Sequence, residues 1–236
     1  MSTHEVRRCS DAVALATEVA AAVAETARAA VASRGRFVLA LAGGETPRAT
    51  HAALAARDDV PWESLTLLLG DERCVPADDP RSNARMVRET LLAPLAARAP
   101  ERALPCLLAP DGADPDPQSA ARRYDALLRE HAPHVDLALL GLGSDGHTAS
   151  VFSDSPLLED DGGRLAAAAY SAATATWRVT LTPSALRAAR ARWFLVVGAA
   201  KAPILAAVLA PGCTLPAARI GPSRFFTDAA RRTAAP

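Results

Sequence analysis

Val135-Asp-Leu-Ala-Leu-Leu-Gly-Leu-Gly-Ser-Asp-Gly-His147-Thr148 is the stretch of this chain that decides its fold. Its first six residues are apolar apart from Asp136, which is typical of a buried strand. A glycine-rich loop follows at once and carries a carboxylate, Asp145, and an imidazole, His147. In open α/β sheets, ligands bind at the carboxyl ends of the strands, and histidine exchanges protons near neutral pH. The stretch therefore predicts proton-transfer chemistry on a small polar substrate at a sheet edge.

Similar strand-to-helix units recur along the chain. The apolar runs predict strands at 36–42, 65–69, 135–140, 178–182 and 193–197. Helical patterns predict helices at 11–33, 47–56, 82–95, 119–130 and 201–209, and one that begins at residue 183. Short strands that alternate with helices favour a mostly parallel sheet with helices on both faces. Because no internal repeat or long linker is visible, we expect an α/β fold and a single domain over residues 1–236.

The charge and composition exclude several classes of protein. The chain carries 26 basic and 26 acidic residues, whereas a nucleic-acid or membrane-surface binder would show a basic excess. We find neither a secretory signal nor a stretch of about 20 strongly apolar residues that could span a membrane. These features predict a cytoplasmic protein that binds neither nucleic acid nor membrane. The four cysteines form no Cys-x-x-Cys pair and are expected to be reduced thiols: Cys9, Cys74, Cys106 and Cys213.

A Gly-Gly turn, Gly43-Gly44, separates the strand at 36–42 from the helix that Pro47 opens. Glycines let backbone N–H groups approach an anion, and the start of a helix adds partial positive charge. The turn and the neighbouring Thr46 are therefore candidates for binding a phosphate group. A tight strand-to-helix turn without a ligand would have the same sequence, so both interpretations stay open.

Three charged residues, Asp71-Glu-Arg73, follow the strand at 65–69. Arg73 offers a planar guanidinium that can bind an oxyanion or a phosphate, and its acidic neighbours can hold it in place. The alternative is a solvated strand end in which the aspartate and the arginine pair with each other. Further along, Ser82 and Asn83 could orient a substrate or could simply cap the helix that begins there.

Asp145 and His147 also have two interpretations. Asp-Gly is a common turn pair, so the segment could be structural, but its place after a buried strand favours a functional role. Thr148 is expected to begin a helix. The i, i+2 spacing leaves open whether the aspartate touches the imidazole. Because no second His or Cys stands at ligand spacing, we expect no metal site.

The remaining histidines and two isolated cations complete the polar candidates. Arg178 leads a strand and Lys201 opens a helix. Each would be a surface charge by itself, but together with the Gly-Gly turn they would form a site for a dianion. The other histidines lie in a terminus or on helices and are expected at the surface: His4, His51, His131 and His134.

Taken together, these segments resemble the 6-phosphogluconolactonases, whose superfamily also contains glucosamine-6-phosphate deaminase. The Asp145-Gly-His-Thr-Ala-Ser150 segment is specific even by itself. The matching segments follow the family order and span nearly the whole chain: Gly43-Gly-x-Thr-Pro47, Asp71-Glu-Arg73 with Val75-Pro76, Ser82-Asn83, Leu140-Gly-Leu-Gly-x-Asp-Gly-His-Thr-Ala-Ser150 with Phe152, Arg178-Val-Thr-Leu-Thr182, Gly198-x-x-Lys201 and Leu215-Pro-Ala217.

The resemblance implies a Rossmann-like α/β fold of the deaminase/lactonase type. It also implies hydrolysis of 6-phospho-D-glucono-1,5-lactone to 6-phosphogluconate, the second step of the oxidative pentose phosphate pathway. Neither a metal nor an organic cofactor is implied. The expected partner is thus a small phosphosugar lactone, and we expect the chain to act as a monomer or a weak homodimer.

Within this hypothesis the candidate residues divide between the two ends of the substrate. His147 would be the general base and would later protonate the ring-oxygen leaving group, with Asp145 supporting the imidazole. Arg73 and backbone N–H groups of the glycine-rich loop, such as that of Gly143, would stabilise the oxyanion. The residues expected to bind the phosphate are Gly43, Gly44, Thr46, Arg178 and Lys201. Those expected to complete the substrate site are Asp71, Ser82, Asn83 and Thr148.

Position 45 departs from the family pattern, which often has Ser where this chain has Glu45. A carboxylate cannot donate a hydrogen bond to a phosphate and would repel it. We therefore expect Glu45 to face solvent or to pair with a basic residue. Phosphate binding would then be left to backbone amides and Thr46.

Two other functions share parts of this pattern. The deaminase usually has Asp-Glu-Tyr at the second loop and Asp-Gly-His-Ile-Ala-Phe-Asn-Glu at the third. Here Arg73 replaces the tyrosine and no Asn-Glu pair follows Ser150, so the acid pair required for ring opening is incomplete. A sugar-phosphate-sensing domain of a transcription regulator would need an added DNA-binding module. The single helix expected before residue 36 leaves no room for one.

Overall fold

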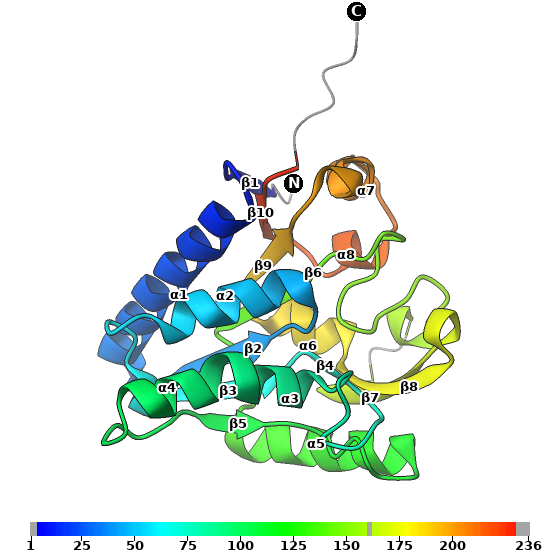
Figure 1. Cartoon of the computed structure of the whole chain (residues 1–236). Coiled ribbons are helices and arrows are strands. Elements are labelled where there is room, and N and C mark those ends of the chain that lie inside the picture. Colours follow the sequence, from blue (N-terminus) through cyan, green and yellow to red (C-terminus); the bar gives the residue numbers. More distant parts are fainter. Residues whose placement is uncertain (1–3, 160–161, 230–236) are drawn as a thin grey trace, which may run out of the picture.

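The fold is described by a computed structural model that covers residues 4–159 and 162–229. Its main feature is a seven-stranded sheet in which neighbouring strands run parallel (Figure 1). The predicted α/β fold with a mostly parallel sheet is therefore confirmed. In spatial order the strands are β1 (Glu5–Arg8), β10 (Arg224–Thr227), β9 (Ala191–Val196), β6 (Leu137–Gly141), β2 (Phe37–Leu41), β3 (Leu65–Leu69) and β5 (Cys106–Leu108).

Helices cover both faces of this sheet, as predicted. Successive strand residues point to opposite faces, so Phe37, Leu39 and Leu41 of β2 pack on one side and Val38 and Ala40 on the other. The first side is covered by α1 (Ala12–Arg34), α2 (Glu45–Ala55), α3 (Asn83–Val87) and α4 (Ala93–Arg98) (Figure 1). The second side is covered by α5 (Pro117–His131), α6 (Pro183–Ala188), α7 (Ala202–Leu209) and α8 (Pro216–Arg219).

Local sequence explains where several helices begin and end. The Asp11 side chain accepts a hydrogen bond from the N–H of Ala14 and caps α1, and Gly35 ends it with φ 74°. A π-helical turn at Arg88–Leu92 joins α3 to α4, so residues 83–98 form one helical segment, called here the 83–98 helix. Single 3₁₀ turns lie at Trp62–Ser64, Pro156–Leu158, Ala172–Thr174 and Ala199–Lys201.

A second, three-stranded antiparallel sheet lies beside the main one and corrects two predictions. It consists of β4 (Asp71–Arg73), β8 (Thr176–Leu181) and β7 (Ala166–Ser171), in that order. Residues 178–182 were expected in the parallel sheet, and 71–73 only as charged residues after a strand. The N–H of Leu181 bonds to the carbonyl of Gly70, which turns the chain into the small sheet directly after β3.

The sequence also did not predict strands β1, β5, β7 and β10, and for the first three the local reason is clear. β1 and β5 are short edge strands, and β1 is largely exposed, so neither shows a long apolar run. β7 begins with four alanines, which have little intrinsic preference for strands. These strands form because a neighbouring strand offers backbone hydrogen bonds, which is information outside the segment itself.

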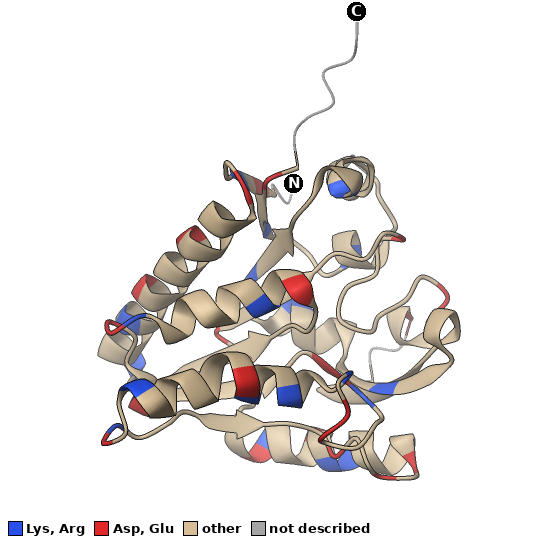
Figure 2. Cartoon of the chain, in the orientation of Figure 1, with Lys and Arg blue, Asp and Glu red and all other residues tan. Residues whose placement is uncertain are grey.

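Charged residues of both signs are mixed over the molecule, as Figure 2 shows for the view of Figure 1. Most ion pairs among the described residues include at least one exposed side chain, such as Arg85 with Glu89 and Arg7 with Glu5. Pairs of this kind contribute little to stability, typically below about 1 kcal/mol. Among residues 4–159 and 162–229, none of the helices has the length and apolar character needed to cross a bilayer.

His51 corrects a further prediction, because it is fully buried and not at the surface. It lies on α2, which packs against α1, the 83–98 helix, β6 and β9. Its two ring nitrogens have no hydrogen-bond partner within the described part of the chain. Burial, with a smaller effect of the Arg48 charge, lowers the pKa of His51 to about 4. His131 and His134 are exposed, as expected, and His4 is half-buried against Phe225.

The buried imidazole makes the fold sensitive to acid. Unfolded, His51 would titrate near its ordinary pKa of about 6.5. Between pH 6.5 and 4 the unfolded chain therefore binds more protons, and the free energy of unfolding falls as pH falls. In the wild type, His51 should lower the free energy of unfolding by about 3 kcal/mol between pH 7 and pH 4. We expect His51→Leu to abolish this decrease, as measured by urea unfolding at each pH. The exposed His131→Leu serves as control, and equal pH slopes for the wild type and His51→Leu would contradict this.

Candidate active site

A cleft opens at the carboxyl ends of β2, β3 and β6. It encloses about 540 Å³ free of protein atoms, part of it open solvent. The chain runs from β2 to β3 and β5 on one side and from β6 to β9 and β10 on the other, so β2 and β6 mark the point where strand order reverses. Ligands bind at this point in open α/β sheets. The lining residues are Ala42, Gly43, Asp71, Arg73, Asn83, Gly141, Leu142, Gly143, His147, Ala149 and Arg178.

The histidine of the cleft is held by the neighbouring aspartate, a contact that the sequence left open. The Nδ1 atom of His147 lies 2.5 Å from Oδ1 of Asp145, and the backbone N–H of His147 donates to the same oxygen. Burial raises the pKa of Asp145, but these hydrogen bonds outweigh it and leave that pKa below its usual range. Because Nδ1 is engaged, Nε2 is the ring nitrogen left to exchange protons.

Gly143 and Phe152 complete the surroundings of this imidazole. A Cβ at Gly143 would lie 2.1 Å from Nδ1 of His147, so a larger residue would displace the ring. The rings of Phe152 and His147 have their centroids 5.0 Å apart, and the guanidinium carbon of Arg178 lies 5.9 Å from the Phe152 centroid. Phe152 was noted in the sequence only as part of a resemblance, and its contacts show that it links the histidine to an arginine.

Two arginines stand together on one wall of the cleft. Arg73 of β4 and Arg178 of β8 are direct partners in the small antiparallel sheet, a placement that brings their Cβ atoms within about 5.5 Å. Burial lowers the pKa of Arg178, and the charge of Arg73 acts in the same direction. The Nε atom of each arginine is buried without a hydrogen-bond partner among the described residues. The contacts of the two guanidinium groups with described residues engage only some of their five N–H groups, so both retain donors for an anionic ligand.

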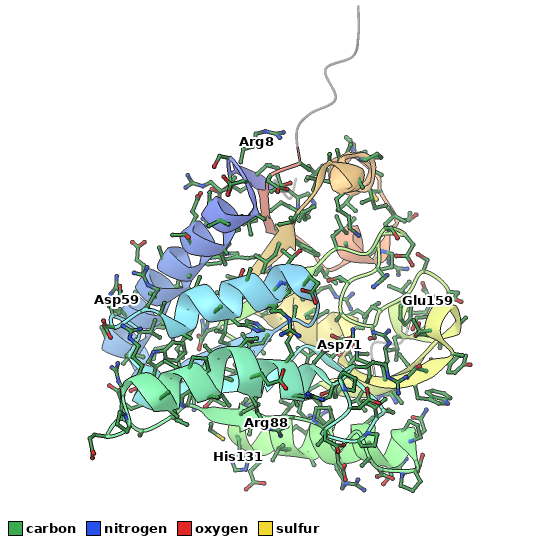
Figure 3. All side chains as sticks on the ribbon, viewed as in Figure 1. Arg8, Asp59, Asp71, Arg88, His131 and Glu159 are labelled. Atoms are coloured by element: carbon green, nitrogen blue, oxygen red, sulfur yellow. The ribbon has the colours of Figure 1, made fainter. Side chains whose placement is uncertain are left out.

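Asp71 balances this positive charge from within the cleft (Figure 3). Its Oδ2 lies 3.5 Å from Nη1 of Arg178 and accepts a 2.6 Å hydrogen bond from the Ser150 hydroxyl. The Asn83 amide donates to the Asp71 carbonyl at 2.8 Å and to its carboxylate at 3.3 Å. Ser150, which sequence reasoning did not select, is fully buried and reaches Asp71 from the end of the loop that carries His147.

The family model for glucosamine-6-phosphate isomerases and 6-phosphogluconolactonases matches residues 10–229 of this chain. The chain belongs to this family. A 6-phosphogluconolactonase of Synechocystis is 38% identical over 190 residues, covering 77% of the chain and 75% of the relative. That of Mycobacterium leprae is 32% identical over 206 residues, covering 83% of each protein.

Solved structures of lactonases have the same fold. The 6-phosphogluconolactonase of Trypanosoma brucei superposes with a TM-score of 0.82 at 27% identity, covering 96% of this chain and 97% of that one. The enzyme of Thermotoga maritima gives a TM-score of 0.82 at 27% identity, covering 95% and 99%. The resemblance to the 6-phosphogluconolactonases is confirmed, and the chain groups with them within the family.

Two residues expected to bind substrate have their side chains engaged inside the protein. The Ser82 hydroxyl donates to Glu72 and accepts from the N–H of Arg85, so it caps the 83–98 helix. Thr148 is fully buried, and its hydroxyl donates to the carbonyl of Gly141. Thr148 does not begin a helix but pairs in a bridge with Val151. Both residues therefore support the loops of this lactonase and do not face the cleft.

Of the residues expected to bind the phosphate, Gly43 and Arg178 line the cleft, whereas three do not: Gly44, Thr46 and Lys201. Lys201 donates from Nζ to the carbonyl of Leu142, a lining residue, at 2.9 Å. Gly44, with φ 102°, caps the start of α2, and Thr46 lies half-buried in the first turn of that helix. The Glu45 side chain is 90% exposed and lies 3.6 Å from Nε of Arg48. It thus behaves as expected, facing solvent and pairing with a basic residue.

Close packing of Asn83 on the first glycine of the Gly-Gly turn can be tested by stability. A Cβ at Gly43 would lie 1.9 Å from Oδ1 of Asn83, whose buried amide is fixed by its bonds to Asp71. We expect Gly43→Ala to lower the free energy of unfolding by about 1–3 kcal/mol in urea titrations. For Gly141→Ala, no described atom lies within 4 Å of the new Cβ, and a change within about 0.5 kcal/mol is expected. Equal effects of the two substitutions would contradict the packing argument.

Proposed function

We propose that this chain hydrolyses 6-phospho-D-glucono-1,5-lactone to 6-phospho-D-gluconate, using a water molecule activated by His147. One observation carries the proposal: the imidazole lines the same cleft as Arg73 and Arg178, with its Nδ1 engaged by Asp145. This arrangement supplies a base with one free nitrogen next to donors for negative charge. An ester carbonyl attacked by water requires both groups.

The proton transfers follow from the state of the imidazole. Nε2 of His147 would take a proton from water as the water oxygen attacks C1 of the lactone. The resulting tetrahedral oxyanion would collapse with cleavage of the bond between C1 and the ring oxygen, which receives the proton back from Nε2. General base catalysis of this kind contributes about 10²–10⁴-fold. Because the chain contains no Gly-x-Ser-x-Gly motif, direct attack by water fits better than an acyl-enzyme.

Charge on the oxyanion would be stabilised by Arg73. The N–H of Gly143, which was expected as a second donor, instead donates to the carbonyl of His147 at 2.9 Å. The guanidinium of Arg73 donates to the carbonyl of Arg81, while its Nε remains a buried donor without a partner in the described chain. A donor fixed before the reaction strengthens its interaction as charge develops, without reorganisation. Asp145 would in turn stabilise the imidazolium that forms during the proton transfer.

The phosphate would lie toward Lys201 and the start of α2. A phosphate ester carries about −1.5 to −2 charges near pH 7. The Nζ atom of Lys201, the N–H groups that follow Gly44, and the Thr46 hydroxyl would provide donors for it. We assign Arg178 to this group too, and its pairing with Arg73 supports a contribution at the reacting end as well.

Removing the proposed base or the oxyanion donor tests the mechanism directly. In assays that follow acid release from freshly prepared lactone, we expect His147→Ala to lower kcat by about 10²–10⁴-fold. Arg73→Ala should lower kcat by about 10²–10³-fold. Wild-type turnover no faster than spontaneous hydrolysis would refute the proposed function. Full activity of His147→Ala would refute the base while leaving the substrate assignment intact.

Removing a phosphate ligand should act on binding. Lys201→Ala loses a charged donor, and we expect KM to rise about 10- to 100-fold with kcat nearly unchanged. Arg178→Ala should raise KM similarly and also lower kcat, because Arg178 stands beside Arg73. Steady-state kinetics on the phosphorylated lactone and on unphosphorylated glucono-1,5-lactone separate these effects. A loss of kcat alone in Lys201→Ala would contradict its placement at the phosphate.

A further inference from the structure

Glu72 is a buried carboxylate whose role the proposed reaction leaves open. It lies on β4 between Asp71 and Arg73, and because side chains alternate along a strand, it points away from the cleft that those two residues line. The residue is 3% exposed. Buried carboxylates are rare because removing a charge from water is costly, and they persist where several partners compensate them.

Four donors compensate Glu72. Its Oε1 accepts from the backbone N–H of Arg73 at 2.7 Å and from that of Asn83 at 2.8 Å. Its Oε2 accepts from the Ser82 hydroxyl at 2.9 Å and from the N–H of Ala84 at 2.7 Å. An ionised carboxylate accepts at both oxygens, so this set of donors matches the charged form. Three of them belong to the start of the 83–98 helix, where the helix dipole also favours negative charge.

The hydrogen bonds of Glu72 connect two segments that line the cleft, β4 and the start of the 83–98 helix. Arg73 supplies the proposed oxyanion donor, and its own backbone N–H is held by Glu72. Asn83, whose backbone is held by the same oxygen, bonds to Asp71 through its side chain and packs against Gly43. The carboxylate of Glu72 thus fixes the spacing between β4 and the loop that follows β2.

We infer that Glu72 is a positioning residue for the proposed hydrolysis, acting through Arg73 and Asn83 without touching the substrate. The inference rests on the proposed function of the cleft. This role differs from one in folding alone, because Glu72 accepts hydrogen bonds from the backbone N–H groups of two residues that line the cleft, Arg73 and Asn83. A small displacement of a reacting group costs up to about 100-fold in rate, which is the scale on which such positioning acts.

Replacing the carboxylate with an amide tests this with little change in shape. In Glu72→Gln, the amide oxygen can still accept from one pair of donors. The NH₂ group takes the place of the other oxygen, where it faces at least one N–H group and cannot accept its hydrogen bond. On the phosphorylated lactone we expect kcat to fall about 10-fold in Glu72→Gln and up to about 100-fold in Glu72→Ala, with KM changed far less. Glu89→Gln, an exposed carboxylate of the same helix paired with Arg85, is the matched control and should leave both constants unchanged.

A double-mutant cycle separates positioning from stability. If Glu72 acts largely through Arg73, most of the loss caused by Glu72→Gln should disappear in an Arg73→Ala background. An equal loss in both backgrounds, or normal kcat in Glu72→Gln, would overturn the inference. Should that variant not fold by circular dichroism, Ser82→Ala removes one of the four donors and is measured in the same cycle. An inactive wild type refutes the proposed function, whereas an active wild type with additive losses refutes the role of Glu72 alone.

Discussion

Parallel pairing of β2 with both β3 and β6 is the constraint on which the site depends. The pairing aligns Leu41 with Leu69 and Ala40 with Ala138, so the loops that leave the three strands emerge at one edge. Residues from positions 43, 71 and 147 meet there although more than a hundred positions separate the first from the last. The strands themselves are almost entirely apolar and buried, and each Leu or Phe side chain removed from water contributes about 1.5–3 kcal/mol. Core burial and strand register therefore set where the three loops begin, independently of the polar contacts in the cleft.

The small antiparallel sheet then imposes a second alignment on the charged groups. The register of β4 with β8 sets Arg73 opposite Arg178 and Asp71 opposite Thr180. Two adjacent guanidinium groups repel each other, and the pair persists because Asp71 lies against Arg178 and the Arg73 guanidinium bonds to the Arg81 carbonyl. Removing one partner from such a network leaves a buried charge uncompensated, at a cost of about 3–5 kcal/mol. The same repulsion makes this wall of the cleft favourable for an anionic ligand, which would neutralise both arginines.

Sequence alone predicted the parallel core and a loop around His147 at its edge, because long apolar runs and the segment around His147 carry local signals. It could not predict β4, since three charged residues have no strand periodicity and form a strand only against β8. His51 was misplaced because a histidine on a helix was taken for a surface residue, whereas it shares the buried face of α2 with Leu54 and Ala55. The contact of Asp145 with His147 depends on backbone angles around Gly146, with φ 85°, that spacing does not determine. The roles of Ser82 and Thr148 depended on side-chain direction, which a sequence pattern does not contain.

The structure explains why glycine is needed at several positions of the cleft. In sequence, Gly43 and Gly44 both look suited to approach a phosphate through their backbone. In the fold the two differ: Gly44 adopts a positive φ, whereas Gly43 must lack a Cβ because the Asn83 amide rests against it. Gly143 is constrained in the same way by the imidazole of His147 and the carboxylate of Asp145. Because positions 43 and 143 have no side chain, the neighbouring polar side chains can pack directly against the backbone there. A glycine-rich loop in this fold therefore holds side chains of the cleft by contact, because the missing Cβ lets them approach the backbone closely.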